Sequence, residues 1–147
     1  MKKVILAAAL FASLGAQAVE VGINASRDTA NQDRTGYGLT VGQKFDKVGI
    51  TAGIDQYKTG VDLSKYSLVG SYDVTKVGAA TVAVKAGVAY LDQKKAVDGY
   101  AALVGAGVSY PLNKELALTA DYRYQAGQSR VSNLNGNTVS AGLKYTF

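Results

Sequence analysis

Apolar and polar residues alternate along most of the chain after residue 18. In the last ten residues Val139, Ala141, Leu143, Tyr145 and Phe147 are separated by polar or small residues. Strict alternation has the two-residue period of a β-strand with two different faces, whereas a helix would mix these faces. Similar segments recur along the chain, and the eight predicted strands centre on residues 19–25, 37–45, 48–54, 66–74, 82–90, 100–110, 116–124 and 139–147. Gln43 and Gly70 interrupt the apolar parity, and Val69 and Leu103 interrupt the polar one.

The predicted connections alternate in length along the chain. Longer ones cover residues 27–35, 58–64, 92–99 and 126–136, and shorter ones cover 46–47, 75–79 and 111–115. Short turns at one end and longer loops at the other are typical of an antiparallel meander that closes into a barrel. The predicted fold is therefore an all-β, eight-stranded antiparallel up-and-down β-barrel.

The apolar parity is too bulky to fill the inside of such a barrel. It holds about 40 side chains, whereas the lumen of an eight-stranded barrel is just filled by ordinary side chains. The other parity is compact and carries nine glycines: Gly22, Gly38, Gly42, Gly49, Gly53, Gly87, Gly105, Gly107 and Gly142. We therefore expect the apolar face to point outward, into lipid, and the strands to cross a membrane.

Aromatic residues of the apolar parity gather at the strand ends. Tyrosine prefers the boundary between hydrocarbon and headgroups because its ring is apolar and its tip is polar. Two aromatic girdles are predicted. The girdle near the longer loops consists of Tyr37, Tyr66, Tyr90, Tyr100 and Tyr124, and the girdle near the short turns of Phe45, Tyr72, Tyr110, Tyr145 and Phe147.

The N-terminus has the pattern of an export signal. Lys2 and Lys3 precede an apolar stretch from Val4 to Leu14, and residues 16–18 give the small-x-small pattern of a cleavage site. We expect residues 1–18 to be a cleaved signal peptide and residues 19–147 to form one barrel domain. Cleavage lowers the formal charge from +5 to +3, since Lys2 and Lys3 are lost, so the charge does not favour nucleic-acid binding.

The composition disfavours most enzyme classes. The chain has no Cys, His or Trp, so thiolate chemistry, His-based acid–base catalysis and zinc sites built on these residues lack their side chains. Carboxylates are scattered rather than spaced as in a calcium loop. We expect no enzyme activity, no cofactor and no metal.

Nine charged residues fall on the inward parity, five of them positive and four negative: Glu20, Lys44, Asp55, Lys65, Asp73, Lys85, Asp121, Arg123 and Lys144. A buried charge is costly unless it is paired, so we interpret these residues as a salt-bridged network that fills the lumen. The alternative is a narrow porin-like ion channel, because rings of charge can select ions.

The C-terminus resembles the assembly signal of bacterial outer-membrane barrels. Gly142, Tyr145 and Phe147 match the Gly-x-x-aromatic-x-aromatic ending, although Ala141 stands where a polar residue is usual. With the signal peptide and the eight strands, the whole chain resembles the small eight-stranded group that includes the OmpA transmembrane domain and OmpX. The resemblance implies a bacterial outer-membrane location and recognition by the barrel-assembly machinery.

The predicted outer loops carry a mixed set of charges. Lys58, Lys94, Lys95 and Arg130 could contact lipopolysaccharide phosphates, and a surface-loop adhesin or host-interaction role is a further alternative by analogy with the family. The expected function is that of a small structural, envelope-stabilising protein. Its expected partners are outer-membrane lipid and lipopolysaccharide, and we expect a monomer.

Overall fold

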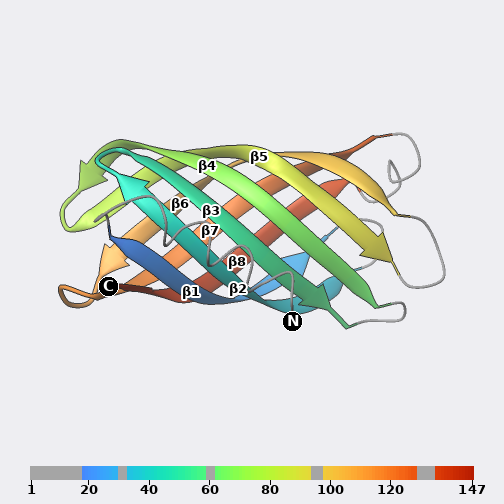
Figure 1. Cartoon of the computed structure of the whole chain (residues 1–147), viewed down its shortest axis with the longest axis horizontal. Coiled ribbons are helices and arrows are strands. Elements are labelled where there is room, and N and C mark those ends of the chain that lie inside the picture. The colour runs from blue at the N-terminus through green and yellow to red at the C-terminus, as the bar shows by residue number, and fades with distance from the viewer. Residues whose placement is uncertain (1–17, 30–32, 59–61, 94–97, 129–134) are drawn as a thin grey trace.

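The chain forms a closed barrel of eight antiparallel strands, here described from a computed structural model (Figure 1). The structure describes residues 18–29, 33–58, 62–93, 98–128 and 135–147. The predicted signal peptide therefore lies outside the described residues except for Ala18. The strands are β1 (Val19–Asp28), β2 (Arg34–Phe45), β3 (Val48–Tyr57), β4 (Leu63–Val77), β5 (Ala80–Gln93), β6 (Gly99–Pro111), β7 (Leu116–Gly127) and β8 (Gly136–Thr146). The predicted fold class is confirmed.

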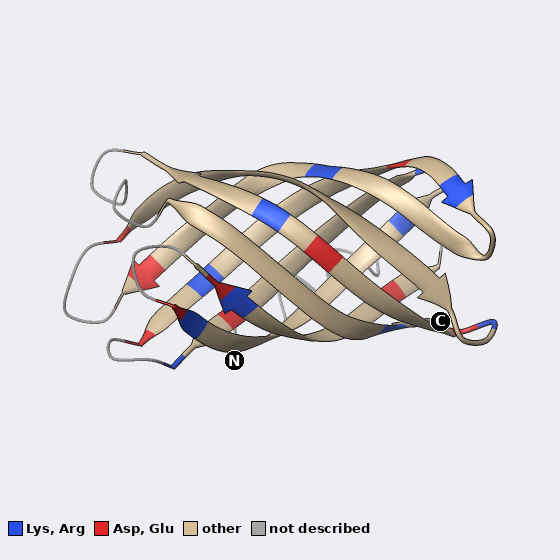
Figure 2. Cartoon of the chain, turned by 180° about the vertical axis from the view of Figure 1, so that it is seen from behind, with Lys and Arg blue, Asp and Glu red and all other residues tan. Residues whose placement is uncertain are grey.

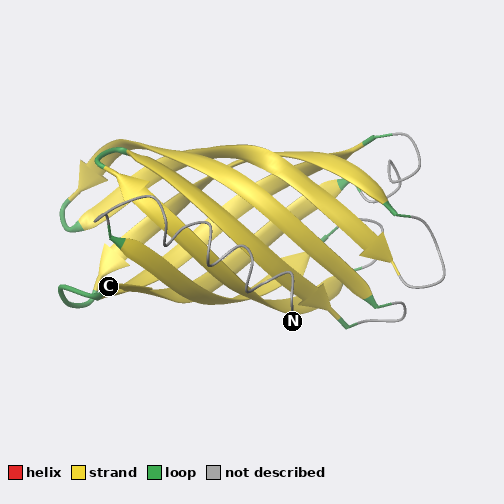
Figure 3. Ribbon diagram, in the orientation of Figure 1, coloured by secondary structure: helices red, strands yellow, loops and turns green. Residues whose placement is uncertain are grey.

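Each strand pairs with its sequence neighbour, and β1 pairs with β8 to close the sheet. The closing ladder runs from Glu20 opposite Thr146 to Asp28 opposite Thr138, and the Phe147 amide donates to the Val19 carbonyl at 2.9 Å. Figure 3 shows the closed sheet, whose strands are tilted along the barrel. Closure matters in lipid because every backbone N–H and C=O must find its partner within the protein.

Local turn chemistry explains the short connections, which lie at the left in Figure 1. Asp46 and Gly78 adopt positive φ values of 54° and 61° at the tips of the β2–β3 and β4–β5 hairpins. Glycine, and to a lesser extent aspartate, tolerates this conformation in tight turns. In the third turn the Asn113 side-chain oxygen accepts hydrogen bonds from the amides of Glu115 and Leu116 at 2.8 and 2.7 Å. We call this the short-turn end and the opposite one the long-loop end.

Most strands extend further than the alternation predicted. The alternation pattern places Asp28 and Arg34 in a loop, whereas in the structure they are strand residues that face each other across β1 and β2. They are 2% and 5% exposed, so they point into the barrel rather than into solvent. At the other end β4 continues to Val77, with a bulge between Asp73 and Thr75 that shifts its register against β5.

The two faces of the wall differ as the alternation predicts. The outward face exposes large apolar side chains from every strand, such as Leu39, Leu68 and Val104 at 52–57%. The inward face is buried or half-buried along most of each strand. No helix among the described residues is long and apolar enough to cross a membrane.

Candidate functional site in the barrel lumen

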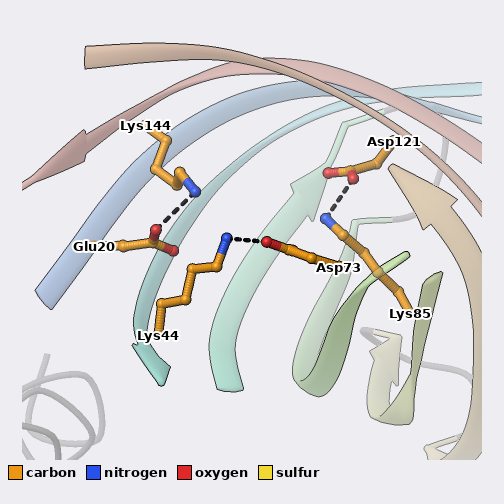
Figure 4. Close-up of polar contacts among 6 residues, drawn as sticks. All are labelled: Glu20, Lys44, Asp73, Lys85, Asp121 and Lys144. Atoms are coloured by element: carbon orange, nitrogen blue, oxygen red, sulfur yellow. Dashed lines mark hydrogen bonds and ion pairs between the residues drawn. The ribbon is translucent and has the colours of Figure 1, made fainter. Parts of the chain in front are cut away.

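Six charged side chains form a ring inside the half of the lumen next to the short turns. In order around the barrel they alternate in sign, and we call them the charged ring: Glu20 on β1, Lys44 on β2, Asp73 on β4, Lys85 on β5, Asp121 on β7 and Lys144 on β8. Figure 4 shows each lysine turned toward a carboxylate. Strands β3 and β6 contribute no charge to this ring.

The charged ring resolves into three ion pairs. Lys144 Nζ lies 2.8 Å from Glu20 Oε1 on the neighbouring strand. Lys44 Nζ lies 2.5 Å from Asp73 Oδ2, and Lys85 pairs with Asp121. The six side chains keep 16–32% of their exposure, so solvent reaches them.

Two of these pairs reach across an intervening strand, and a glycine makes room for each. Gly49 on β3 lies between the strands of Lys44 and Asp73, and Gly107 on β6 between those of Lys85 and Asp121. A Cβ atom at Gly107 would overlap an Asp121 carboxylate oxygen, and one at Gly49 would lie 2.6 Å from Ser71 Oγ. The glycines of the polar parity therefore clear space for lumenal side chains, because lumen volume is limiting.

A polar cavity of about 160 Å³ lies within this half of the lumen. The charged ring lines it together with hydroxyl side chains, among them Thr40, Thr51, Ser67 and Ser71. Arg123 also lines the cavity; its Nη2 donates to Ser140 Oγ at 3.5 Å. The short-turn half of the lumen therefore contains a small cavity lined by charged and hydroxyl side chains.

The half of the lumen next to the long loops is closely packed and contains apolar as well as polar side chains, since Asp28, Arg34 and Gln125 are buried there too. Tyr57, Leu63, Leu91 and Ala101 form one cluster, 0–2% exposed, which we call the apolar plug. Val69, Ala89 and Leu103 form a second cluster. Val69 and Leu103, which interrupt the polar parity in the sequence, are thus lumenal packing residues on β4 and β6.

Buried charges lie beside the apolar plug. Lys65 is 1% exposed, and its Nζ donates to Gln125 Oε1 at 3.3 Å. Asp55 lies opposite Lys65 in the β3–β4 register and is 2% exposed. The predicted inward charges therefore separate into the charged ring, the buried Asp55 and Lys65, and Arg123 near Ser140.

Sequence reasoning missed several lumenal residues. Asp28, Arg34, Tyr57, Leu63 and Leu91 all face inward at strand ends that the predicted boundaries left in or beside loops. Extending the two-residue period by one or two pairs into each loop would have found them. The predicted boundaries missed Asp28 and Arg34 because they resemble loop residues, and missed Tyr57, Leu63 and Leu91 because apolar residues on the inward parity break the alternation.

The predicted girdle residues lie on the outer face. Tyr37, Tyr72, Tyr100 and Phe147 are 50–76% exposed. Contacts link several of the aromatic side chains: the Tyr90 and Tyr100 rings are 5.2 Å apart, and those of Tyr145 and Phe147 are 4.8 Å apart. The remaining predicted members are exposed or half-buried: Phe45, Tyr66, Tyr90, Tyr110, Tyr124 and Tyr145. Tyr122, outward and 52% exposed, was not assigned to a girdle.

Only some of the charged residues of the predicted loops lie within the described residues. Of the four cations considered for lipopolysaccharide, Lys94, Lys95 and Arg130 lie outside the described residues, and Lys58 Nζ lies 5.6 Å from the centre of the Tyr37 ring. Arg27 Nε donates to Asp33 Oδ1 at 2.8 Å. This hydrogen bond from Arg27 lowers the pKa of the exposed Asp33 carboxyl.

Among the described residues no three His, Cys, Asp or Glu side chains are grouped to hold a metal ion.

Comparison with known proteins agrees with this architecture. The model of the YfaZ precursor family matches residues 1–147. No curated protein sequence matches the chain. Two similar solved structures come from Pseudomonas aeruginosa. The N-terminal β-barrel domain of OprF has a TM-score of 0.75 at 22% identity, covering 90% of this chain and 99% of that domain, and the outer membrane protein OprG has a TM-score of 0.67 at 15% identity, covering 90% and 96%.

Neisserial surface protein A is a third structural relative, with a TM-score of 0.69 at 17% identity over 88% of this chain and 96% of that protein. At these identities the likeness concerns the fold, and it confirms the predicted resemblance to small eight-stranded outer-membrane barrels. The family match spans the whole chain. The chain therefore belongs to the YfaZ family and is a β-barrel protein of the bacterial outer membrane.

Proposed function

We propose that this protein is a closed structural barrel that stabilises the outer membrane, rather than a diffusion channel. The observation that supports this proposal is the apolar plug. Its residues are 0–2% exposed, and they sit in the lumen directly beneath the long loops. The charged side chains packed beside the plug, Asp28, Arg34, Asp55 and Lys65, are also only 1–5% exposed. An ion crossing this closely packed layer would have to give up its water, which is costly for any charge.

The charged ring has a structural role in this proposal. Its three ion pairs neutralise charges that would otherwise destabilise the lumen. They also connect strands that are not neighbours, since Lys44 on β2 reaches Asp73 on β4 and Lys85 on β5 reaches Asp121 on β7. The lumenal ion pairs therefore link strands of the barrel from the inside and stabilise their arrangement.

A catalytic role has little support in the lumen. The chain has no His or Cys, and the ring carboxylates Glu20, Asp73 and Asp121 are each held by a lysine. An ionised carboxylate held in this way is a weak general acid. We therefore propose that the protein is not an enzyme.

The outer face supplies the anchorage. The two girdles would hold the barrel at the two membrane boundaries. Gly142, Tyr145 and Phe147, at the end of the closing strand or beside it, are the residues by which we expect the barrel-assembly machinery to recognise the chain. Closure leaves no free sheet edge for another chain to pair with, so we expect a monomer in contact with outer-membrane lipid and lipopolysaccharide.

Planar-bilayer recording of the refolded full-length chain tests the closed-barrel proposal. We expect no large, stable unitary currents from the unsubstituted protein. A Tyr57→Ala, Leu91→Ala double variant serves as the open control, since it removes two of the three large plug side chains and should conduct. Large and stable currents from the unsubstituted protein would favour the narrow-channel alternative instead.

A further inference from the structure

Among the described residues, the lumen contains one more positive than negative side chain. Eleven charged side chains among the described residues are buried or half-buried: the cations are Arg34, Lys44, Lys65, Lys85, Arg123 and Lys144, and the anions are Glu20, Asp28, Asp55, Asp73 and Asp121. A charge removed from bulk water without a counter-charge is strongly unfavourable. The excess positive charge therefore favours the binding of an anion in the lumen.

Most of these charges are matched within the protein. The charged ring accounts for three cations and three anions. Asp28 and Arg34 face each other in register, and both have interaction partners. Asp55, Lys65 and Arg123 remain, and together they carry one positive charge.

Of the two remaining cations, Lys65 and Arg123, only Arg123 is positioned to bind a ligand from solution. Lys65 is 1% exposed and donates to Gln125, whereas Arg123 lines the 160 Å³ cavity. Within the described part of the chain, Arg123 Nε is buried and has no hydrogen-bond partner. Its Nη2 donates to Ser140 Oγ at 3.5 Å, and its charge also acts on Lys65 and Tyr57.

We propose that Arg123 binds a small oxyanion, such as inorganic phosphate or a small carboxylate, that enters the cavity from the short-turn end. The planar guanidinium presents its N–H groups as a fork that fits two oxygens of such an anion. The cavity volume equals the share of about five water molecules in the liquid, which suits an anion of a few heavy atoms. Hydroxyl groups of Thr40, Thr51, Ser67 and Ser71 line the same cavity and supply further donors.

The site lies on the periplasmic side if the barrel follows the rule that short turns face the periplasm. It opens on one side only, since closely packed side chains, the apolar plug among them, fill the other half of the lumen. The proposal is thus independent of the closed-barrel function: an oxyanion can occupy a blind cavity whether or not ions cross the barrel.

NMR of arginine side chains tests the site directly. The chain has only four arginines, so the Nε–H signal of Arg123 can be identified by its loss in Arg123→Gln. We expect inorganic phosphate, titrated into the folded full-length chain in zwitterionic detergent at constant ionic strength, to shift the Arg123 Nε–H and Ser140 amide signals saturably. The Arg27 signal should not follow the same curve.

Two variants sharpen this test. Arg123→Lys keeps the charge but loses the fork, so we expect phosphate affinity to fall at least about tenfold. Lys47→Gln removes an exposed cation at the same end of the barrel, outside the lumen, and should leave the affinity unchanged. A linear, non-saturating shift, or equal weakening by Lys47→Gln, would overturn the proposal.

A stability measurement gives an independent answer if Arg123→Gln folds poorly. A ligand that binds only the folded state raises the free energy of unfolding as its concentration rises. Phosphate should therefore stabilise the unsubstituted protein and Lys47→Gln more than it stabilises Arg123→Lys, at matched ionic strength. Equal stabilisation of all three proteins would reflect a general salt effect and would contradict the site.

Discussion

In the half of the lumen beneath the long loops, the apolar plug is packed beside buried charged side chains such as Asp55 and Lys65, whereas the half beside the short turns holds three lysine–carboxylate pairs around a cavity. Both halves are enclosed by the same eight strands. Figure 2 shows how the charges are distributed along the wall. The side chains of the first half are almost fully buried, whereas the paired charges of the second half are 16–32% exposed.

This difference teaches that a narrow barrel has two ways of filling its lumen. Apolar packing gives a tight seal, but each side chain must fit its neighbours. Paired charges tolerate a looser fit because water can complete their hydrogen bonds. We therefore expect substitutions to cost most in the packed half and least where solvent screens the charges.

Removing the Tyr57 ring should have the largest effect. Tyr57 is 1% exposed at the end of β3, so Tyr57→Ala should leave a cavity in the apolar plug and cost about 3–5 kcal/mol of unfolding free energy. The measurement is urea unfolding in phospholipid vesicles, followed by circular dichroism. Tyr57→Phe keeps the ring volume and should cost less than about 1.5 kcal/mol. Similar losses for both variants would show that the hydroxyl group, rather than packing, matters.

Adding a methyl group at Gly87 should have an intermediate effect. Gly87 faces the lumen on β5 between the two halves, and a Cβ there would overlap the Leu68 carbonyl oxygen. Gly87→Ala should therefore cost about 1–3 kcal/mol through overpacking, measured in the same unfolding assay.

Gly70 is the matched control for Gly87. It lies on the outward face of β4, opposite Ala86 in the register, and a Cβ there has only the Ala86 carbonyl oxygen nearby, at 3.7 Å. Gly70→Ala should change stability by no more than about 0.5 kcal/mol. If both substitutions cost the same, glycine would matter in these strands for its backbone and not for lumenal space.

Separating one pair of the charged ring should have the smallest effect. A double-mutant cycle with Lys44→Met and Asp73→Asn should give a coupling energy of about 1 kcal/mol, because these side chains are 32% and 19% exposed and solvent screens them. The corresponding cycle for the exposed pair Arg27 and Asp33 should show no measurable coupling. Equal coupling in the two pairs would mean that the lumen gives its ion pairs no advantage.

The sequence by itself determined the barrel and the direction of its faces. Alternation with a two-residue period is a local property, so the pattern of Val139, Leu143 and Phe147 already separates the outward face from the inward one. The inward parity of Lys44, Lys85 and Asp121 follows in the same way. The apolar face must then meet lipid, because its side chains are too bulky for the small lumen of an eight-stranded barrel.

Only the tertiary structure decided which lumenal residues meet. Lys44 and Asp73 are 29 positions apart, and Lys144 and Glu20 are 124 apart. Their contact depends on strand register and barrel closure, and alternation does not fix either of them. The same holds for the apolar plug, which gathers Tyr57 and Leu91 from β3 and β5, two strands that are not neighbours. Parity decides which face of the sheet a side chain occupies, and only the closed barrel decides which other lumenal side chains it contacts.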